Sequence, residues 1–363
     1  MSRLCTLLLV AIASAGFGQA PEFPDFSRWE IVDPAARQMT YMNRPSLFLS
    51  GGIALMPETQ LADGTIEFDV AIHGQQGFAG VVFRATSHDD YELIYLRTHR
   101  SRQWDALQYT PIFAGQEAWQ LYSGQGYNGA AELPANRWVR VRVVVEGYQA
   151  QVFIDEAPKP QLLITDLKRE WTSGRIGLWG RFGAANVSNF KVTPLERSRP
   201  PARRLAAPAP GVIARWSLSQ ALAAADVPPD RVPDGLTWES VVADATGIVN
   251  IAAVRRPPPG AKTPRSTVFA RAVLRVPEDQ RVRLAFGYSD EVTIFLDGRR
   301  VFSGRNGYLA RDGSSLGTLT LGPDAIFLDL PAGRHELVCA VTEVFGGWGI
   351  AARLDDARGI SVE

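Results

Sequence analysis

Cysteine and histidine are scarce in this chain of 363 residues, which contains two Cys and four His. Cys5 stands near the N-terminus, and Cys339 lies inside the apolar run 337–341. So few thiols exclude a disulfide scaffold and a cysteine-rich zinc site. The histidines lack the i, i+4 spacing of paired ligands on a helix, which argues against transition-metal catalysis. We expect Cys339 to be a small core residue.

The chain also lacks an excess of charge of one sign and, after its first 20 residues, any long apolar run. Its 38 Lys+Arg balance its 38 Asp+Glu, so the formal net charge is zero. This balance argues against a basic nucleic-acid-binding protein and against an acidic tail. No later stretch approaches the roughly 20 apolar residues of a membrane-spanning helix, so we expect no membrane span.

The N-terminal segment has the pattern of a secretory signal peptide. Arg3 supplies the positive start, residues 7–13 form an apolar stretch, and Gly18 and Ala20 flank Gln19 as a small-x-small cleavage site. We expect cleavage after Ala20 and a protein that is secreted or periplasmic in a bacterium. A buried N-terminal strand or helix is the alternative interpretation.

Residues 197–210 are rich in Pro, Ala and Arg and show no hydrophobic periodicity, as expected for a linker. This segment divides the chain after the signal peptide into residues 21–196 and 211–363. Each part is long enough to bury a core of its own.

Both parts show the period-two alternation of β-strands. In segment 65–72, Ile66, Phe68, Val70 and Ile72 share one face. Further strands are expected at 78–84, 91–98, 106–110, 119–122, 138–146, 149–154, 161–164, 174–179, 187–192, 267–274, 280–288, 292–296, 300–303, 325–330, 336–343 and 349–354. One short helix is expected around 219–225. The pattern predicts an all-β fold with two β-sandwich or jelly-roll domains.

Two groups of segments carry a resemblance to known families. The first comprises Gly64-Thr65-Ile66-Glu67-Phe68-Asp69, Gly80-Val81-Val82-Phe83-Arg84, Trp138-Val139-Arg140-Val141 and Gly174-Arg175-Ile176-Gly177-Leu178-Trp179. Their order resembles the concanavalin A-like lectin/glucanase fold in its laminin-G-like branch, and is similar to the 3-keto-disaccharide hydrolase domain. The second comprises Gly287-Tyr288-Ser289-Asp290, Leu296-Asp297-Gly298 and Leu330-Pro331-Ala332-Gly333-Arg334. It resembles galactose-binding-like jelly rolls and protective-antigen-type carbohydrate modules.

Aromatic and cationic side chains are concentrated along segment 89–99. Alternation places Tyr91, Tyr95, Arg97 and His99 on one face of a strand, and aromatic rings with polar neighbours suit sugars. We therefore predict a glycan groove on the concave sheet of the first domain, binding an oligosaccharide or polysaccharide. A solvated sheet face is the alternative. The predicted ligand-binding residues are Arg84, Tyr91, Tyr95, Arg97, His99, Trp104, Gln108, Tyr109, Trp119, Tyr122 and, in the second domain, Trp348.

Glycoside hydrolysis needs two carboxyl groups that face each other. The resemblance implies the laminarinase pattern Glu-x-Asp-x-x-Glu, but here Ile72 follows Glu67 and Asp69 at the position of the last Glu. The remaining candidate pair is Glu92 with Asp105, although alternation places Glu92 opposite Tyr91.

The sequence indicates no cofactor, with a structural calcium ion left open as an alternative. Its candidate ligands are Asp89, Asp90, Asp155, Asp290 and Asp312. Three functions also stay open. The first is an exported glycan-binding protein, the second a glycoside hydrolase of keto-disaccharide or glucan type, and the third an extracellular protein-interaction module.

Overall fold

The computed structural model describes residues 25–74, 76–197, 199, 201–203, 207–258 and 265–363. The predicted signal peptide lies outside these residues, as do five positions of the predicted linker. The predicted all-β class is confirmed, because the described residues form 26 strands and four short 3₁₀ helices but no α-helix. None of the helices in the described part is long and apolar enough to cross a bilayer.

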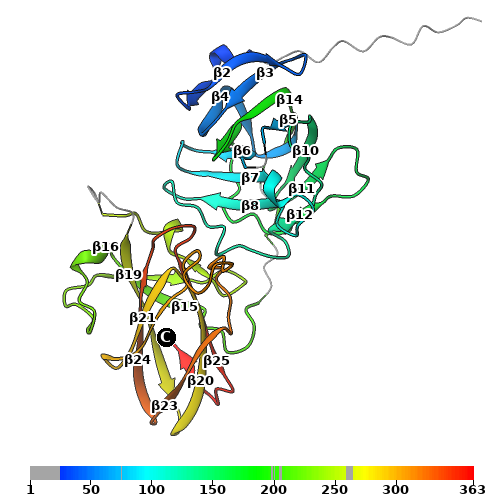
Figure 1. Cartoon of the computed structure of the whole chain (residues 1–363). Helices are drawn as coiled ribbons and strands as arrows, with labels where there is room; N and C mark the ends of the chain where they lie inside the picture. Colours follow the sequence, from blue (N-terminus) through cyan, green and yellow to red (C-terminus); the bar gives the residue numbers. More distant parts are fainter. Residues whose placement is uncertain (1–24, 75, 198, 200, 204–206, 259–264) are drawn as a thin grey trace, which may run out of the picture.

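Strands β1 to β14 form two seven-stranded antiparallel sheets, which we call the N-terminal sandwich (Figure 1). The first sheet has the order β1 (Glu30–Val32), β4 (Gly52–Leu61), β13 (Gly174–Arg181), β6 (Phe78–Ala85), β7 (Tyr91–Arg97), β8 (Leu107–Ile112) and β9 (Asn128–Gly129). The second has the order β12 (Leu162–Ile164), β11 (Gln149–Ile154), β10 (Val139–Glu146), β5 (Asp63–Ile72), β14 (Ala185–Leu195), β3 (Arg44–Leu49) and β2 (Arg37–Tyr41).

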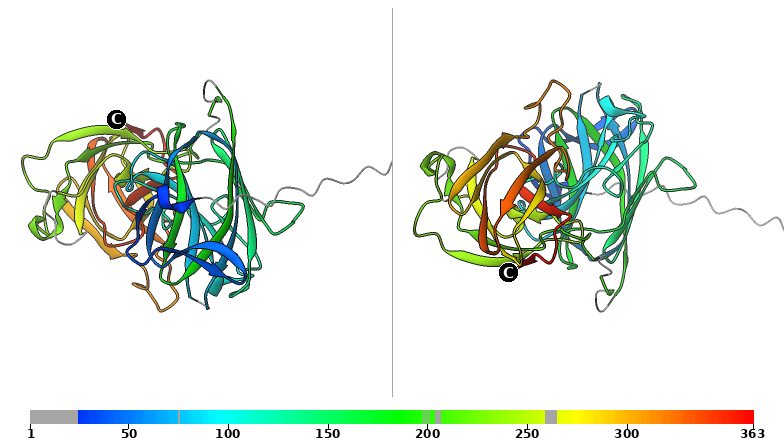
Figure 2. Two further views of the ribbon diagram at one scale, coloured as in Figure 1. Left: turned by 90° about the horizontal axis from the view of Figure 1, so that it is seen from above. Right: turned by 90° about the horizontal axis from the view of Figure 1, so that it is seen from below.

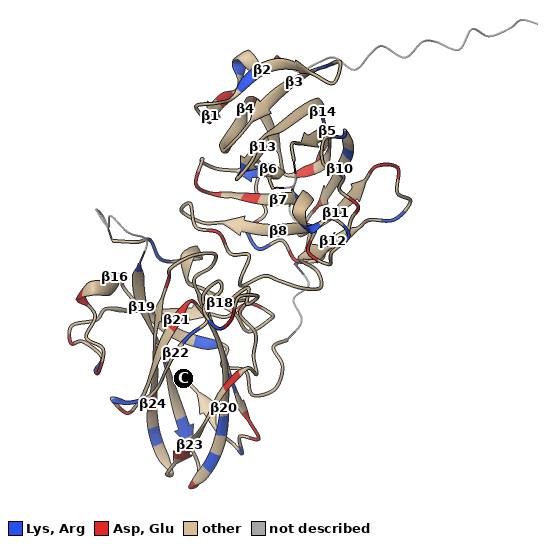
Figure 3. Ribbon diagram, in the orientation of Figure 1, with Lys and Arg blue, Asp and Glu red and all other residues tan. Residues whose placement is uncertain are grey.

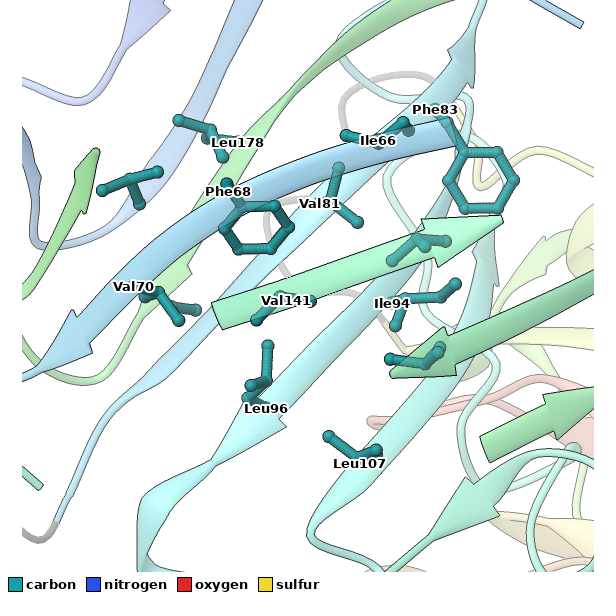
Figure 4. Packing of buried hydrophobic residues seen from close by; sticks show 14 of the residues in the cluster. Ile66, Phe68, Val70, Val81, Phe83, Ile94, Leu96, Leu107, Val141 and Leu178 are labelled. Atoms are coloured by element: carbon teal, nitrogen blue, oxygen red, sulfur yellow. The ribbon is translucent and has the colours of Figure 1, made fainter. Parts of the chain in front are cut away.

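The core of the N-terminal sandwich lies between its two sheets (Figure 4). Ile66, Phe68 and Val70 on β5 are buried there, as the alternation of this segment predicted. From the first sheet, Ile94 and Leu96 of β7 point toward them. Because successive residues of a strand point to opposite faces, Tyr95 and Arg97 lie on the other face of the first sheet.

Strands β15 to β26 form two further sheets, the C-terminal sandwich. Its larger sheet has the order β17 (Trp238–Val242), β15 (Arg215–Ser219), β19 (Ser266–Val276), β24 (Gly333–Thr342), β21 (Glu291–Leu296) and β22 (Arg299–Arg305), with β16 (Leu222–Ala223) and β26 (Ser361–Val362) also paired to β19. The smaller sheet has the order β18 (Val249–Asn250), β25 (Gly349–Asp355), β20 (Gln280–Ser289) and β23 (Asp324–Leu330). Trp216, Trp348 and Cys339 are buried between them, and burial raises the pKa of the Cys339 thiol to about 12.

Two local predictions were wrong. Residues 119–122 form a turn instead of a strand. The N–H groups of Leu121 and Tyr122 donate to the Ala118 carbonyl, and the backbone of Gln120 bonds to the C-terminal sandwich. The helix expected around 219–225 is replaced by the end of β15, the short strand β16 and the 3₁₀ helix η3 (Ala224–Asp226). The other 3₁₀ helices are η1 (Phe26–Arg28), η2 (Thr98–Arg100) and η4 (Ile251–Ala253).

The two sandwiches meet through the segment that follows β8, residues 113–128 (Figure 1 and Figure 2). Leu121 and Tyr122 of this segment pack against Ile248 and Leu319 of the C-terminal sandwich. Gln120 is fully buried there and donates from its side-chain nitrogen to the Leu316 carbonyl at 3.0 Å. The contact therefore combines apolar packing with specific hydrogen bonds, which fixes how the two sandwiches are placed.

Candidate functional site

A pocket with a volume of about 660 Å³ lies between the two sandwiches, beside segment 113–128. The N-terminal sandwich supplies most of its wall, from β6, β7, β13 and the loops that follow them. The C-terminal sandwich contributes three side chains. The lining residues are Gln76, Phe78, Tyr95, Arg97, His99, Arg100, Asp105, Glu117, Trp119, Trp179, Arg181, Phe182, Tyr308, Leu316 and Phe345.

The floor of the pocket is aromatic, and the register of three neighbouring strands produces it. Gly80 on β6 pairs with Tyr95 on β7 and with Trp179 on β13, so the two rings lie on either side of a residue without a side chain. Their centroids are 5.4 Å apart. A Cβ at Gly80 would lie 2.8 Å from the Cβ of Tyr95, so the position requires glycine. Phe78, two residues earlier on β6, extends this floor and contacts Tyr95 at 5.8 Å.

One hydrogen-bonded cluster in the pocket wall is built around the guanidinium of Arg97. Its Nη1 donates to Asp105 Oδ2 at 2.9 Å, and its Nη2 donates to the Tyr95 hydroxyl at 2.8 Å and to Gln108 Oε1 at 2.5 Å. Arg100 donates through Nε to the other oxygen of Asp105 at 2.8 Å. The Asp105 side chain is 2% exposed. Both of its oxygens are therefore committed to arginines, and its role is to hold two guanidiniums in place.

The pocket wall also contains Glu117, which forms an ion pair with Arg181 and accepts a hydrogen bond from the Trp119 indole. Burial raises the pKa of Glu117, and the nearby guanidiniums of Arg181 and Arg97 partly oppose that rise. The Arg181 guanidinium also lies over the Phe182 ring, 4.6 Å from its centroid. Charge and aromatic surface are thus adjacent around Glu117 too.

Tyr308 and Phe345 are the aromatic side chains that the C-terminal sandwich adds to the pocket. Each makes an edge contact with Trp119, at 6.1 Å and 6.0 Å between ring centroids. The Asp290 carboxylate positions Phe345, because its Oδ2 accepts from the backbone N–H of Val344 at 2.7 Å and of Phe345 at 2.6 Å. Burial raises the pKa of Asp290 to about 6, although these two N–H groups favour the charged form.

Five residues proposed from the sequence line this pocket: Tyr95, Arg97, His99, Asp105 and Trp119. The structure therefore brings part of the predicted strand face together with a residue from the following loop and one from segment 113–128.

Four proposed residues lie in the interior instead. Arg84 is fully buried, with Nε donating to the Ala62 carbonyl at 2.8 Å and Nη2 to Asp63 and the Gly147 carbonyl. Glu92 accepts from the Tyr109 hydroxyl at 2.8 Å inside the N-terminal sandwich, and neither side chain is exposed.

Trp348 fills the core of the C-terminal sandwich and donates to the Val341 carbonyl at 3.0 Å. Because Glu92 points into the core while Asp105 lines the pocket, these two carboxyl groups do not face one cleft.

The remaining proposed residues are next to the pocket or away from it. Gln108 does not line the pocket, but its side-chain oxygen accepts a hydrogen bond from Arg97. Tyr91 is buried in the apolar cluster between β4, β6 and β7. Tyr122 lies at the contact between the sandwiches, and Trp104 is about half exposed on its loop but does not line the pocket.

Sequence reasoning did not select Trp179, Arg181 and Phe182 at the end of β13, nor Glu117. A signal was present for Trp179 and Arg181, since residues two apart on a strand share a face. Tyr308 and Phe345 were not selected either, since more than 180 residues separate them from Trp119 along the chain.

The described residues contain no group of three or more His, Cys, Asp or Glu side chains that could hold a metal ion. The five aspartates considered for calcium do not come together. Asp90 pairs with Arg169, and Asp155 pairs with Arg137.

No protein-family model and no curated protein sequence matches this chain. Among solved structures, it is similar to the carbohydrate-binding module CBM66 from Bacillus subtilis, with 15% identity and a TM-score of 0.33 over 44% of this chain and 91% of that chain. A protein with a galectin-like fold from Bacillus subtilis matches with 13% identity and a TM-score of 0.35 over 46% and 89%. The exoplasmic/lumenal domain of VIP36, in a Ca²⁺/Man3GlcNAc-bound form, matches with 12% identity and a TM-score of 0.34 over 49% and 88%.

Proposed function

We propose that this protein binds a carbohydrate in the pocket between its two sandwiches. The observation that carries the proposal is the combination of an aromatic floor, formed by Phe78, Tyr95 and Trp179, with charged hydrogen-bonding groups in the same pocket wall. Sugar rings have apolar C–H faces that pack on aromatic rings and hydroxyls that need polar partners. The volume of about 660 Å³ is within the size range of pockets that bind small-molecule ligands.

Two exposed rings on the rim provide the test, because their removal leaves the core intact. Phe182 and Tyr308 are 63% and 49% exposed and come from different sandwiches. We expect the full chain to bind oligosaccharides on a glycan array, and Phe182→Ala and Tyr308→Ala each to weaken binding about three- to tenfold in calorimetry. Phe327→Ala is the matched control, since Phe327 is 61% exposed and does not line the pocket.

Absence of any glycan binding would refute the proposal. Binding that is equally insensitive to the Phe182, Tyr308 and Phe327 substitutions would place the ligand elsewhere.

Hydrolysis at the same pocket is the second candidate, and Glu117 is the residue that favours it. Its pKa is raised by burial, as suits a proton donor. A glycosidase needs a second carboxylate as nucleophile or base, and Asp105 is held by two guanidiniums. Release of reducing ends that disappears in Glu117→Gln would establish hydrolysis, whereas binding without release would leave the pocket a binding site.

We further propose that the N-terminal sandwich is of the concanavalin A-like type and the C-terminal sandwich of the galactose-binding-like type, as two domains joined at 197–210. Two seven-stranded antiparallel sheets packed face to face support the first assignment. Export from the cell follows from the signal-peptide pattern at residues 1–20. N-terminal sequencing of the protein from a bacterial periplasm or culture medium tests it, with Pro21 expected as the first residue.

A further inference from the structure

Positive side chains outnumber negative ones along the pocket wall. Three arginines, Arg97, Arg100 and Arg181, line it, against the two carboxylates of Asp105 and Glu117. The chain as a whole has no such bias, since its formal net charge is zero and Figure 3 shows acidic and basic residues interspersed over both sandwiches. The concentration of guanidinium groups is therefore a local property of this pocket.

The two carboxylates do not cancel this positive charge for a ligand. Both Asp105 oxygens accept hydrogen bonds from Arg97 and Arg100, and the side chain is 2% exposed, so it offers a ligand no acceptor. Glu117 is paired with Arg181, and burial raises its pKa, which disfavours its charged form. A bound group would therefore meet guanidinium N–H donors more readily than carboxylate acceptors.

Arg100 and Arg181 are the donors that remain available. Each side chain is 36% exposed and lines the pocket. Arg100 uses Nε for Asp105 and Arg181 uses Nη1 for Glu117, and no other hydrogen bond of these two guanidiniums to a described residue is formed. A guanidinium with two free N–H groups matches the two oxygens of a carboxylate.

We propose that the pocket selects acidic sugars, with Arg100 and Arg181 each as the partner of one uronic acid carboxylate. This inference rests on the proposed carbohydrate-binding function and names the class of its ligand. The sugar rings of an oligouronate would pack on the aromatic floor while one carboxylate meets each arginine. His99 lines the same pocket, and its pKa is lowered by burial and by the nearby Arg97 and Arg100.

The binding test compares sugars that differ in a single charge. The full chain is titrated with trimers of galacturonic, mannuronic and guluronic acid, with their methyl esters, with neutral galactose and mannose trimers, and with a sulfated neutral trimer. We expect at least one uronate trimer to bind, and its methyl ester to bind about tenfold more weakly. Arg100→Gln and Arg181→Gln should each lower uronate affinity about tenfold while leaving ester affinity unchanged.

Arg102→Gln is the matched control. Arg102 is an exposed arginine on the same loop that pairs with Glu132 outside this pocket. Equal affinity for acid and ester, or loss of affinity only in Arg102→Gln, overturns the inference. Binding of the neutral or sulfated trimers but of no uronate trimer also overturns it while the proposed function stands. If no trimer and no glycan on the array binds, both the inference and the proposed carbohydrate-binding function are refuted.

A second readout on the unchanged protein covers the case in which an arginine variant fails to fold. The pKa of the His99 imidazole is followed by NMR, with the signal assigned from a His99→Gln variant. We expect this pKa to rise when the uronate trimer binds and to stay constant with the methyl ester, because only the acid brings a negative charge. A His99 pKa that stays constant while the acid binds overturns the inference.

Discussion

Lys168 is a buried cation that pairs with one carboxylate from each sandwich, and we expect its removal to destabilise the protein. Its Nζ lies 2.8 Å from Asp166 of the N-terminal sandwich and 2.7 Å from Asp244 of the C-terminal sandwich, and the side chain is 3% exposed. The ammonium also lies 4.6 Å from the Tyr122 ring and 5.5 Å from the Tyr127 ring. Burial opposes its charge, but these four neighbours more than offset it and raise the pKa.

Lys168→Met keeps the length of the side chain and removes the charge. Deleting one partner of a buried ion pair costs about 3–5 kcal/mol, since the remaining charge is left uncompensated. Here both carboxylates are 20% exposed, and Asp166 keeps Arg203 at 2.8 Å. We therefore expect a loss near the lower end of that range, about 3 kcal/mol in the free energy of unfolding.

Urea denaturation at pH 7, followed by tryptophan fluorescence and by calorimetry, measures this loss. Because Asp244 belongs to the other sandwich, we also expect the variant to unfold in two transitions instead of one. Adding Asp244→Asn should restore at least about 1 kcal/mol, since the orphaned charge is removed. Arg102→Met, which breaks an exposed pair with Glu132, should cost less than about 1 kcal/mol.

The reasoning is refuted if Lys168→Met changes the free energy of unfolding no more than Arg102→Met does, or if the double variant is less stable than Lys168→Met alone.

Three further predictions concern the C-terminal sandwich. The pKa of Asp290 is raised to about 6, so the folded state holds its proton more tightly. Stability should then fall by up to about 3 kcal/mol between pH 4 and pH 7, and Asp290→Asn should flatten this fall in urea titrations. Gly346 has a φ of +92°, and a Cβ at this position would lie 2.6 Å from Gln120 Oε1 across the contact between the sandwiches. Gly346→Ala should therefore lower the melting temperature. Gly313→Ala, in open space, should leave the melting temperature unchanged. The hydrogen bond that the His335 ring donates to Asp297 raises the pKa of His335, so the stabilisation from this bond is complete below about pH 6.5 and is lost as pH rises. The stability difference between the wild type and His335→Gln should therefore be larger at pH 6 than at pH 9.

The parts of the site that lie on one strand could be predicted from the sequence. Tyr95 and Arg97 are two residues apart on β7, and period two places them on one face whatever the rest of the fold does. The same rule applied to Glu92 puts its carboxylate on the core side, where Tyr109 satisfies it. That placement was available from the pattern. Glu92 was considered for the pocket because carboxylates are rarely buried in a protein core.

Arg84 could not be placed by alternation. Its backbone has a φ of +52°, and the pairing between β13 and β6 shifts register between Arg175 and Gly177. An irregularity of this kind changes which face the following side chain takes. The guanidinium then turns into the interior and pairs with Asp63, which is also fully buried. No residue type in this stretch marks the shift, since a non-glycine with positive φ is rare and has no sequence signature.

The C-terminal sandwich contributes side chains to the pocket because a few polar groups form hydrogen bonds across the contact between the sandwiches. The sequence does not show which of these groups pair. Gln120 makes four hydrogen bonds across the contact: its N–H donates to Gly346 at 3.1 Å, its carbonyl accepts from Leu319 at 2.7 Å, and its side chain donates to Leu316 at 3.0 Å and accepts from Ser289 at 2.9 Å. Separating the sandwiches would break all four at once. Rearranging them without water would leave buried polar groups unpaired, at about 1–3 kcal/mol each. Since Leu316 and the residue before Gly346 also line the pocket, the same bonds hold its wall in place before any ligand arrives. A preformed wall spares the ligand the free energy of ordering it, so affinity should depend on the pocket's own rings and arginines rather than on closure of the two sandwiches.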